Sequence, residues 1–411
     1  MAVRREALAK RRRARGLSQE QLAECLAVDR STVGRWERGD ADPVPWVRPF
    51  LAQALEITLD DLDLLLASVV DVSGEDLLPL WMVGEVTPAF FADSARKALD
   101  FTTSFAPPSQ ASDIDSLSRR VARIANAYLV DPLDDVVPEV QALRAESEQL
   151  LSTPNRLYQS PDLLVVLART LALLANAAMD AGEHAAAHSH AEAAARVASA
   201  TGHSGVTAWA RGLQASNAFW AGDHAGSAKI AAKALPAASQ GTTAVFLACL
   251  LARASGRIGD HRAVVQALDW AERARDRAKH DEIGGVFAFN EAKQYLYAAT
   301  AHLGVGGDPT RALAYAQAAV SQYAQASSRS FGDESGARVD VATAYLRLGE
   351  PDGAIEALEP VLGLPPNLRV ATIRTRLRRV RSELVAAYGD LPAARDAVGR
   401  IDALHSTAPT L

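Results

Sequence analysis

The chain has 411 residues, with 43 Lys and Arg, 49 Asp and Glu, a formal net charge of −6 and 49% hydrophobic residues. At about 100 to 200 residues per domain, this length predicts two or three domains, and the hydrophobic fraction is ample for folded cores. The composition excludes a disordered chain, a collagen and a disulfide scaffold. Cys25 and Cys249 lie in apolar helical patterns, so we expect two buried free thiols in a reducing cytoplasm.

The charges are distributed unevenly along the chain. Residues 1–39 carry ten Lys and Arg against five Asp and Glu, whereas residues 40–411 carry 33 against 44. A small basic segment on a large acidic chain indicates contact with nucleic acid at one end, because phosphate binding needs local positive charge. We expect no membrane partner, since the longest apolar stretch, Leu163 to Met179, is interrupted by Arg169 and Asn176 and is shorter than a span of ~20 residues.

Helix signals in residues 1–66 predict five short helices, at about residues 3–15, 19–26, 30–38, 45–55 and 58–66. Ser18 with Gln21 forms a capping-box pattern, Asp29 is the expected cap of the third helix and Gly39 its expected end, and Thr58 is the expected cap of the fifth. The predicted core consists of Leu8, Leu17, Leu22, Ala23, Leu26, Val28, Val33, Trp36, Phe50, Leu51, Leu55, Ile57, Leu62 and Leu65.

The run GLSQEQLAECLAVDRSTVGRWERGDADPVPWVRPFLAQALEI resembles the helix-turn-helix domain of the lambda repressor and Cro family, the Xre type. The resemblance covers about residues 4–66, with SQEQLA in the second helix, RSTVGRWERG in the third and LAQAL further on. It implies that the third helix lies in the major groove of DNA, with residues near its start at base edges. It also implies an ion pair between Arg12 and Glu37 that bridges the first and third helices, which gives Glu37 a structural role.

Arg30, Ser31 and Arg35 fall on the face of the third helix opposite Val33 and Trp36. We expect these three residues to read bases, since an arginine fork matches O6 and N7 of guanine. For the basic run at residues 11–15, a solvated helix face is the alternative to phosphate contact. Gly34, in the middle of the third helix, is explained either by a close approach to DNA or by simple tolerance. The expected phosphate contacts are Gln19, Thr32, Arg38, Arg12 and Arg13.

Residues 67–115 are rich in proline but too apolar for an open linker. We expect a docked connector with one short helix at Pro88–Leu99, whose Phe90 and Phe91 pack on a neighbour. From Leu117 onward, a Gly followed by Asp or Glu recurs in GEHAAA at 182, GDHAGS at 222, GDHRAV at 259, GDPTRA at 307, GEPDGA at 349 and GDLPAA at 389. In each, the glycine suits a left-handed turn and the acid suits the cap of the next helix.

These repeats resemble tetratricopeptide repeats, lengthened and degenerate. We therefore predict an all-α fold with a five-helix helix-turn-helix head at residues 1–66, a connector at 67–115, and a right-handed superhelical α-solenoid of helix pairs at 116–411 that senses a ligand or partner and dimerises. The first helix of each pair should line a concave groove. The polar and aromatic candidates there are Asn176, Trp209, Ser216, Trp220, Arg253, Arg257, Gln294, Thr343, Arg376 and Arg379.

No Walker loop, GxGxxG after a strand, GxSxG or HExxH occurs in the sequence. We expect no enzyme, no cofactor and no metal, and we interpret His184, His188 and His190 as solvated helix residues.

The plan of the chain resembles the peptide-sensing tetratricopeptide regulators of Gram-positive bacteria, as in quorum sensing, and the actinobacterial Xre-type regulators with a helical C-terminal region. This resemblance implies a cytoplasmic, homodimeric transcriptional regulator that binds operator DNA and is controlled by a peptide or small molecule in the groove. The alternative is a repeat scaffold that docks a partner protein, with the head as a weak DNA anchor. A closed, Trp-lined cavity would favour the small ligand, and an open polar groove the scaffold.

Overall fold

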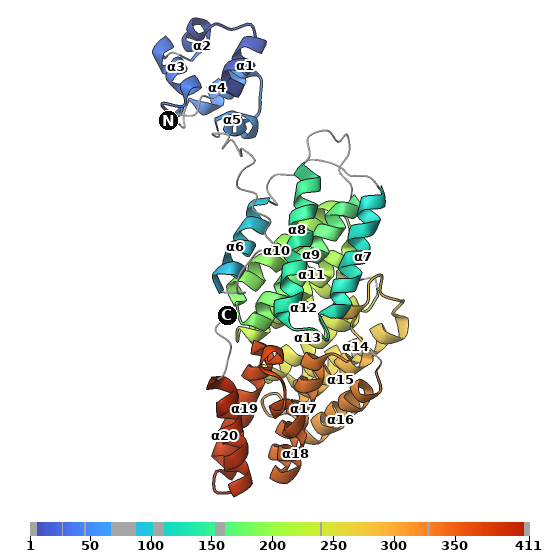
Figure 1. The fold of residues 1–411 in the computed structure, drawn as a ribbon. Helices are drawn as coiled ribbons and strands as arrows, with labels where there is room; N and C mark the ends of the chain where they lie inside the picture. Colours follow the sequence, from blue (N-terminus) through green and yellow to red (C-terminus); the bar gives the residue numbers. More distant parts are fainter. Residues whose placement is uncertain are drawn as a thin grey trace. The chain divides into compact units, whose positions relative to one another are not determined.

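The computed structural model describes residues 6–26, 28–44, 47–66, 88–101, 111–152, 161–238, 241–326 and 329–406. Within these ranges the regular elements are α-helices and short 3-10 helices (Figure 1). The chain divides into two compact units, residues 1–79 and 80–411. The predicted all-α class is confirmed.

The N-terminal unit consists of α1 (Glu6–Ala14), α2 (Gln19–Cys25), α3 (Arg30–Arg38), α4 (Arg48–Leu55) and α5 (Leu59–Leu66). The Ser18–Gln21 capping box opens α2 as predicted, and Gly39, at φ 76°, ends α3. Asp29 stands at the N-cap position of α3 but makes no capping hydrogen bond, so that prediction is wrong. Thr58 caps the start of α5 through its hydroxyl, which accepts from the backbone N–H of Asp61.

The core of this unit lies between the five helices and contains Leu8, Leu22, Val33, Trp36 and Leu51, among others. Phe50 was expected in this core, but its side chain is 62% exposed. The buried face of α4 (Arg48–Leu55) consists of Leu51, Ala52 and Leu55, and Val47 enters the core in front of it. Phe50 precedes Leu51 and lies about 100° away from it around the helix, outside this face.

The second unit begins, in its described part, with α6 (Pro88–Phe101), followed by α7 (Ala111–Ala127) and α8 (Leu133–Ser152). The expected docked helix is confirmed, because Phe91 is fully buried and Phe90 packs against the same core. Gln141 and Arg144 of α8 also donate hydrogen bonds to Ser94, at 2.6 Å to its hydroxyl and 2.7 Å to its carbonyl oxygen. Residues 67–87 and 102–110 of the predicted connector lie outside the described residues.

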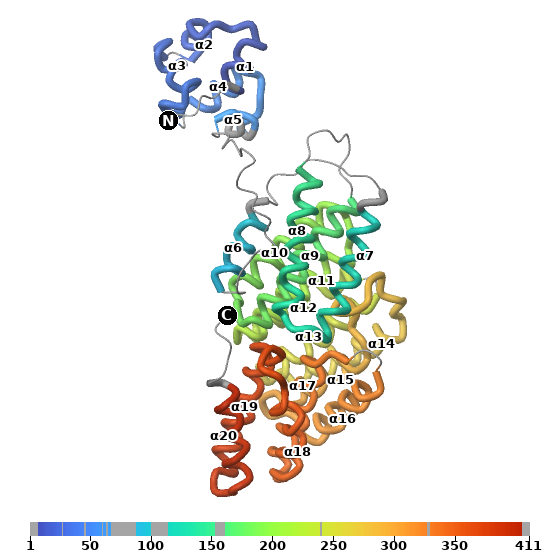
Figure 2. The backbone as a smooth tube through the Cα atoms, viewed as in Figure 1, coloured from blue at the N-terminus to red at the C-terminus, as the bar shows by residue number. Residues whose placement is uncertain are grey.

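Six helix pairs follow, and Figure 2 traces them from green to red. They are α9 (Pro161–Ala181) with α10 (His184–Thr201), α11 (Ser204–Trp220) with α12 (His224–Ala234), α13 (Thr243–Arg257) with α14 (His261–Arg277), α15 (Glu291–His302) with α16 (Pro309–Gln325), α17 (Phe331–Leu348) with α18 (Pro351–Leu362), and α19 (Ala371–Tyr388) with α20 (Pro392–Ser406). Each predicted Gly-acid pair lies at the turn inside one helix pair, as expected for tetratricopeptide-like repeats.

The turns depart from the expected chemistry in two ways. Glycines 182, 222, 259 and 349 have the expected positive φ. In the fourth turn the residue with positive φ is Gly306 rather than Gly307, and in the sixth turn Gly389 has a right-handed helical conformation. The aspartates 223, 260 and 308 cap the following helix through their side chains, whereas the glutamates 183 and 350 do not. The shorter aspartate side chain is the one that suits an N-cap, where its oxygen reaches the N–H of the first turn.

The first helices of the pairs contact one another in sequence, from α9 through α11, α13, α15 and α17 to α19. In addition, α19 packs against α9. The contact is close, because a Cβ on Gly182 would lie 3.3 Å from that of Ala371, and the Thr372 hydroxyl lies 3.1 Å from Asp180 Oδ1. The C-terminal end of α9 therefore meets the start of α19, and the six first (inner) helices of the pairs lie around a shared space.

The two cysteines, His190 and the apolar α9 helix each bear on a prediction from the sequence. Cys249 is buried as expected, but Cys25 is exposed on α2. His190 is fully buried in α10 rather than solvated. The α9 helix is long and apolar enough to cross a membrane, but 94% of its apolar window is buried inside the second unit, as in the core helix of a globular protein.

Candidate DNA-binding helix and ligand cavity

The α3 helix has one buried and one exposed face. Val33 and Trp36 are buried in the core, whereas Arg30, Ser31 and Arg35 are exposed, as the helical period of the sequence predicts. Arg30 forms an exposed ion pair with Glu20 of α2, with Nε 2.9 Å from Oε1. Exposed pairs of this kind contribute little energy, so this pair offers little resistance to a base contact.

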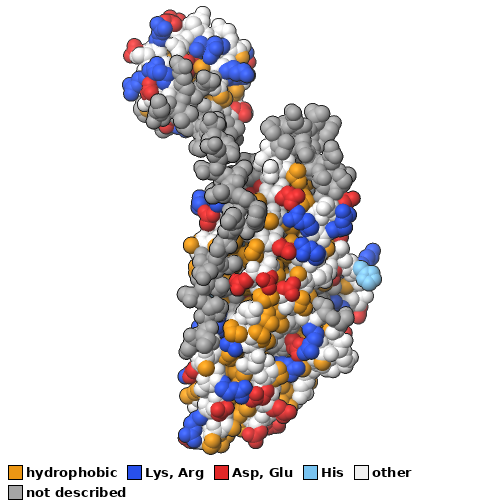
Figure 3. Space-filling view, viewed as in Figure 1, with side chains coloured by type: hydrophobic (Ala, Val, Ile, Leu, Met, Phe, Trp, Pro, Cys, Tyr) orange, Lys and Arg blue, Asp and Glu red, His pale blue; other side chains and the backbone are white. Residues whose placement is uncertain are grey.

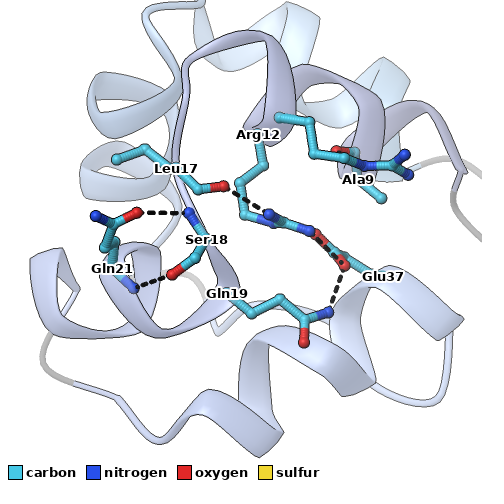
Figure 4. A network of polar contacts seen from close by, with 8 residues as sticks. Ala9, Arg12, Leu17, Ser18, Gln19, Gln21 and Glu37 are labelled. Atoms are coloured by element: carbon cyan, nitrogen blue, oxygen red, sulfur yellow. Dashed lines mark hydrogen bonds and ion pairs between the residues drawn. The ribbon is translucent and has the colours of Figure 1, made fainter.

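A buried polar network holds α3 against α1 and α2 (Figure 4). The Arg12 guanidinium donates to both oxygens of Glu37, at 2.7 Å from Nε and 3.3 Å from Nη2, and its Nη1 donates to the Leu17 carbonyl at 2.6 Å. Gln19 Nε2 donates to Glu37 Oε2 at 2.7 Å. The bridge expected from the family resemblance is therefore present, and Glu37 is its centre.

This network changes the expected set of phosphate contacts. Arg12 is buried and its guanidinium is bound to Glu37 and Leu17, so it is not available for the expected phosphate contact. Gln19 shares its side-chain nitrogen with the same network. Arg13 is exposed and points along α1, where its Nε donates to the Ala9 carbonyl.

The other arginines of the basic run stabilise the unit. Arg11 donates to the carbonyl oxygens of Leu55 and Glu56 at the end of α4, and Arg15 pairs with the Glu56 carboxylate. Arg38, another expected phosphate contact, is exposed and pairs with Asp40, while Thr32 is half-buried. Figure 3 shows Lys and Arg side chains at several places on the surface of this unit. In the basic run, Arg11, Arg12 and Arg15 are thus bound within the unit, and Arg13 is exposed.

Gly34 lies where α3 crosses α2, and it is buried. A Cβ at this position would lie 3.2 Å from Arg38 Nη1 and 3.9 Å from Gln19 Nε2. The glycine is thus packed against side chains of its own unit, and Arg38 Nη1 is the end of a flexible, exposed chain.

A cavity of about 110 Å³ lies between the inner helices of the second unit. Such a volume exceeds the space of a single water several times and suits a small ligand rather than an extended peptide. Its lining includes Asn176 and Asp180 of α9, Trp209, Ser216 and Trp220 of α11, Phe246 and Arg253 of α13, Lys293 and Tyr297 of α15, Asp333 of α17, and Thr372 and Arg376 of α19.

Six of the predicted groove residues therefore meet around one cavity: Asn176, Trp209, Ser216, Trp220, Arg253 and Arg376. The others do not. Arg257 and Arg379 line a separate surface pocket, Gln294 accepts a hydrogen bond from Arg275 on the side of α14, and the Thr343 hydroxyl donates to a carbonyl oxygen within α17.

The acidic side of the cavity is formed by residues that the repeat pattern did not reveal. Tyr128 and Thr372 contact the two oxygens of Asp180, at 2.8 and 3.1 Å. Burial raises the pKa of the Asp180 carboxyl to about 6. Burial alone would lower the pKa of Lys293, but the charge of Asp333, whose Oδ2 is 3.2 Å from Nζ, raises it.

Two buried arginines define the basic side. Arg376 forms an ion pair with Asp340, which also accepts from the Thr300 hydroxyl at 2.6 Å. Among the described residues, no carboxylate pairs with Arg253 in this way. Its guanidinium carbon lies 3.9 Å from the ring centre of Phe219, 4.2 Å from that of Tyr297 and 5.2 Å from that of Trp220. Burial lowers the pKa of Arg253 to about 10, so the group is charged at neutral pH.

The chain thus combines a small five-helix unit, in which α3 has one exposed face, with a larger unit of tetratricopeptide-like helix pairs. Residues 5–65 match the family model of a helix-turn-helix domain, so the N-terminal unit is a helix-turn-helix domain. The match covers this unit and does not extend into the repeats.

No curated protein sequence matches the chain. Among solved structures, Bacillus thuringiensis PlcR in complex with the peptide PapR7 and DNA aligns over 98% of this chain and 99% of its own, at 11% identity and a TM-score of 0.31. The Cut9–Hcn1 hetero-tetramer of APC/C aligns over 97% of this chain and 86% of its own, at 14% identity and a TM-score of 0.34. At these scores neither likeness bears on function.

Proposed function

We propose that the protein is a transcriptional regulator of the cytoplasm that binds operator DNA through its helix-turn-helix head and is controlled by a small ligand in the cavity of its repeat body. The observation that carries the second part is the cavity between the inner helices, with Trp209 and Trp220 in its lining. The contact of α9 with α19 narrows the concave face at one end, which favours a small ligand over a docked partner protein.

In the head, Arg30, Ser31 and Arg35 are proposed as base readers because all three are exposed on α3 and the first two lie at its N-terminus. The proposed phosphate contacts are Arg13, Arg38, Thr32 and the start of α2 at Gln19. Contacts of this kind position the domain on DNA and do not specify bases. A head of about 60 residues offers few contacts, so a homodimer should read two half-sites about 34 Å apart.

Ligand control requires that the ligand binds two conformations of the body with different affinity. A ligand in the cavity could have such a difference in affinity, because the lining comes from all six inner helices and one ligand would contact most of the repeats at once. Among ligand classes, its volume favours a small molecule over a peptide.

Selection of duplexes from a random pool by the full chain tests the DNA part. We expect an enriched inverted repeat, whose half-site spacing matches a dimer seen by sedimentation. A pool that shows no enrichment at moderate salt would refute sequence-specific binding. Mass spectrometry of the protein purified under native conditions tests the ligand part: a bound small molecule supports it, whereas a stoichiometric partner protein supports the scaffold instead.

A further inference from the structure

Arg253 carries a charged guanidinium in the interior of the second unit. The residue is 1% exposed, and it lines the cavity. Among the described residues, no acceptor is within hydrogen-bond distance of its Nε or Nη2. Polar groups buried in this way are strongly disfavoured unless a partner binds them, and a charged one more so.

The two unpartnered nitrogens form one edge of the guanidinium, the edge that grips a carboxylate elsewhere in this protein. Arg12 holds Glu37 through Nε and Nη2, and Arg347 holds Glu383 through the same two atoms, at 3.3 and 2.7 Å. The rings of Phe219 and Tyr297 lie against the Arg253 guanidinium, with their centres 3.9 and 4.2 Å from its central carbon. The rings hold the side chain in place, while the buried Nε and Nη2 have no acceptor among the described residues.

The surrounding charges favour an anion at this edge. The positive charges of Arg376 and Arg379 lower the pKa of Arg253, and the negative charge of Asp340 raises it. Asp340 already pairs with Arg376. The group of arginines thus has more positive charge than its carboxylate neutralises, in a site with a low dielectric constant, where a buried anion gains most from pairing.

We propose that Arg253 binds the anionic head of a small organic ligand, a carboxylate or a phosphate, whose apolar body lies against the aromatic lining of the cavity. The apolar wall is supplied by Trp209, Phe246 and Phe289, whose rings pack on one another with centroids 4.7 and 5.3 Å apart. The indole N–H of Trp209 is also buried without an acceptor, which adds a second donor to the lining. The cavity, at about 110 Å³, is smaller than the apolar cavity of ~150 Å³ that holds a benzene ring, so the ligand should be no larger than one ring with one anionic group.

The inference rests on the proposed function only in calling this ligand an effector. Its test uses the full chain without DNA, so its outcome does not depend on operator binding. Calorimetric titration compares phenylacetate and phenyl phosphate with the uncharged phenylacetamide. We expect at least one anion to bind, and phenylacetamide to bind at least about tenfold more weakly, as loss of a charge-assisted hydrogen-bond pair requires. Whichever anion binds more tightly identifies the head group.

Arg253→Met should weaken binding of the preferred anion at least about tenfold, while Arg196→Met, which removes an exposed arginine of α10, leaves it unchanged. The melting temperature of the unliganded protein gives a second readout. Arg253→Met should raise it, because a buried charge without a partner is removed, whereas Arg376→Met should lower it by leaving Asp340 without its partner. If neither anion binds, if phenylacetamide binds equally well, or if Arg253→Met lowers the melting temperature and leaves binding intact, the proposal is wrong.

Discussion

Asp180 provides a test of the electrostatics of the cavity. Its pKa rises from 3.8 in an ordinary setting to about 6 because the carboxyl is buried. At about 1.4 kcal/mol per pH unit, the ionised carboxylate therefore destabilises the folded body by roughly 3 kcal/mol above pH 6. Between about pH 4 and 6 the folded state binds the extra proton, so stability falls as pH rises through this window.

The substitution Asp180→Asn removes the charge and keeps an acceptor for one of the two hydroxyls that contact it, those of Tyr128 and Thr372. We expect the variant to be more stable than the wild type by up to about 3 kcal/mol at pH 8, and to show little or no gain at pH 4. Urea unfolding followed by circular dichroism at both pH values measures this difference.

Asp333→Asn is the matched control. Asp333 pairs with Lys293, so the same change of Asp to Asn leaves a buried ammonium without its carboxylate and should destabilise the body at pH 8. An equal effect of Asp180→Asn at pH 4 and 8, or a loss of stability at pH 8, would refute the assignment of a burial-raised pKa to Asp180.

Three further predictions concern the N-terminal unit and the thiols. Glu37→Ala leaves Arg12 buried without its carboxylate and should lower the stability of the unit by about 3 to 5 kcal/mol in thermal unfolding; a loss below 1 kcal/mol would contradict the role of the network. Gly34→Ala should raise stability by up to about 1 kcal/mol, since Arg38 can move aside, and a net loss would show that it cannot. Iodoacetamide should alkylate Cys25 and spare Cys249, whose pKa burial raises to about 12, as peptide mass mapping would show.

Local signals in the sequence were enough to predict the helices of the head and the spacing of the repeats. The bounds of α3 and the turn at each Gly-acid pair follow from caps and helical period, which act within a few residues. Phe50 shows the limit of this reasoning, because the sequence places Phe50 and Leu51 side by side and packing against the other helices decides which of them is buried.

The cavity depends on contacts between distant parts of the chain. Trp209, Trp220 and Arg253 were placed by the repeat pattern, but their meeting with Asp180 depends on the packing of α19 against α9, which no local pattern encodes. For the same reason, the sequence could not tell that Arg376 has a buried carboxylate partner and that Arg253 has none among the described residues. Nor could it tell which arginines of the run at 11–15 face solvent.

The reading of bases by α3 is the central claim, and the specificity of an Arg35→Ala variant tests it most directly. The affinities of the wild type and the variant for a selected duplex and for its scrambled sequence are measured at one salt concentration by fluorescence anisotropy. Loss of a bidentate base contact, worth ~1 to 3 kcal/mol, predicts that the ratio of the two affinities falls about 5- to 150-fold in Arg35→Ala. Arg13→Ala, which removes a proposed phosphate contact, should weaken binding to both duplexes and keep the ratio. A ratio that is the same for Arg35→Ala and the wild type would contradict the claim.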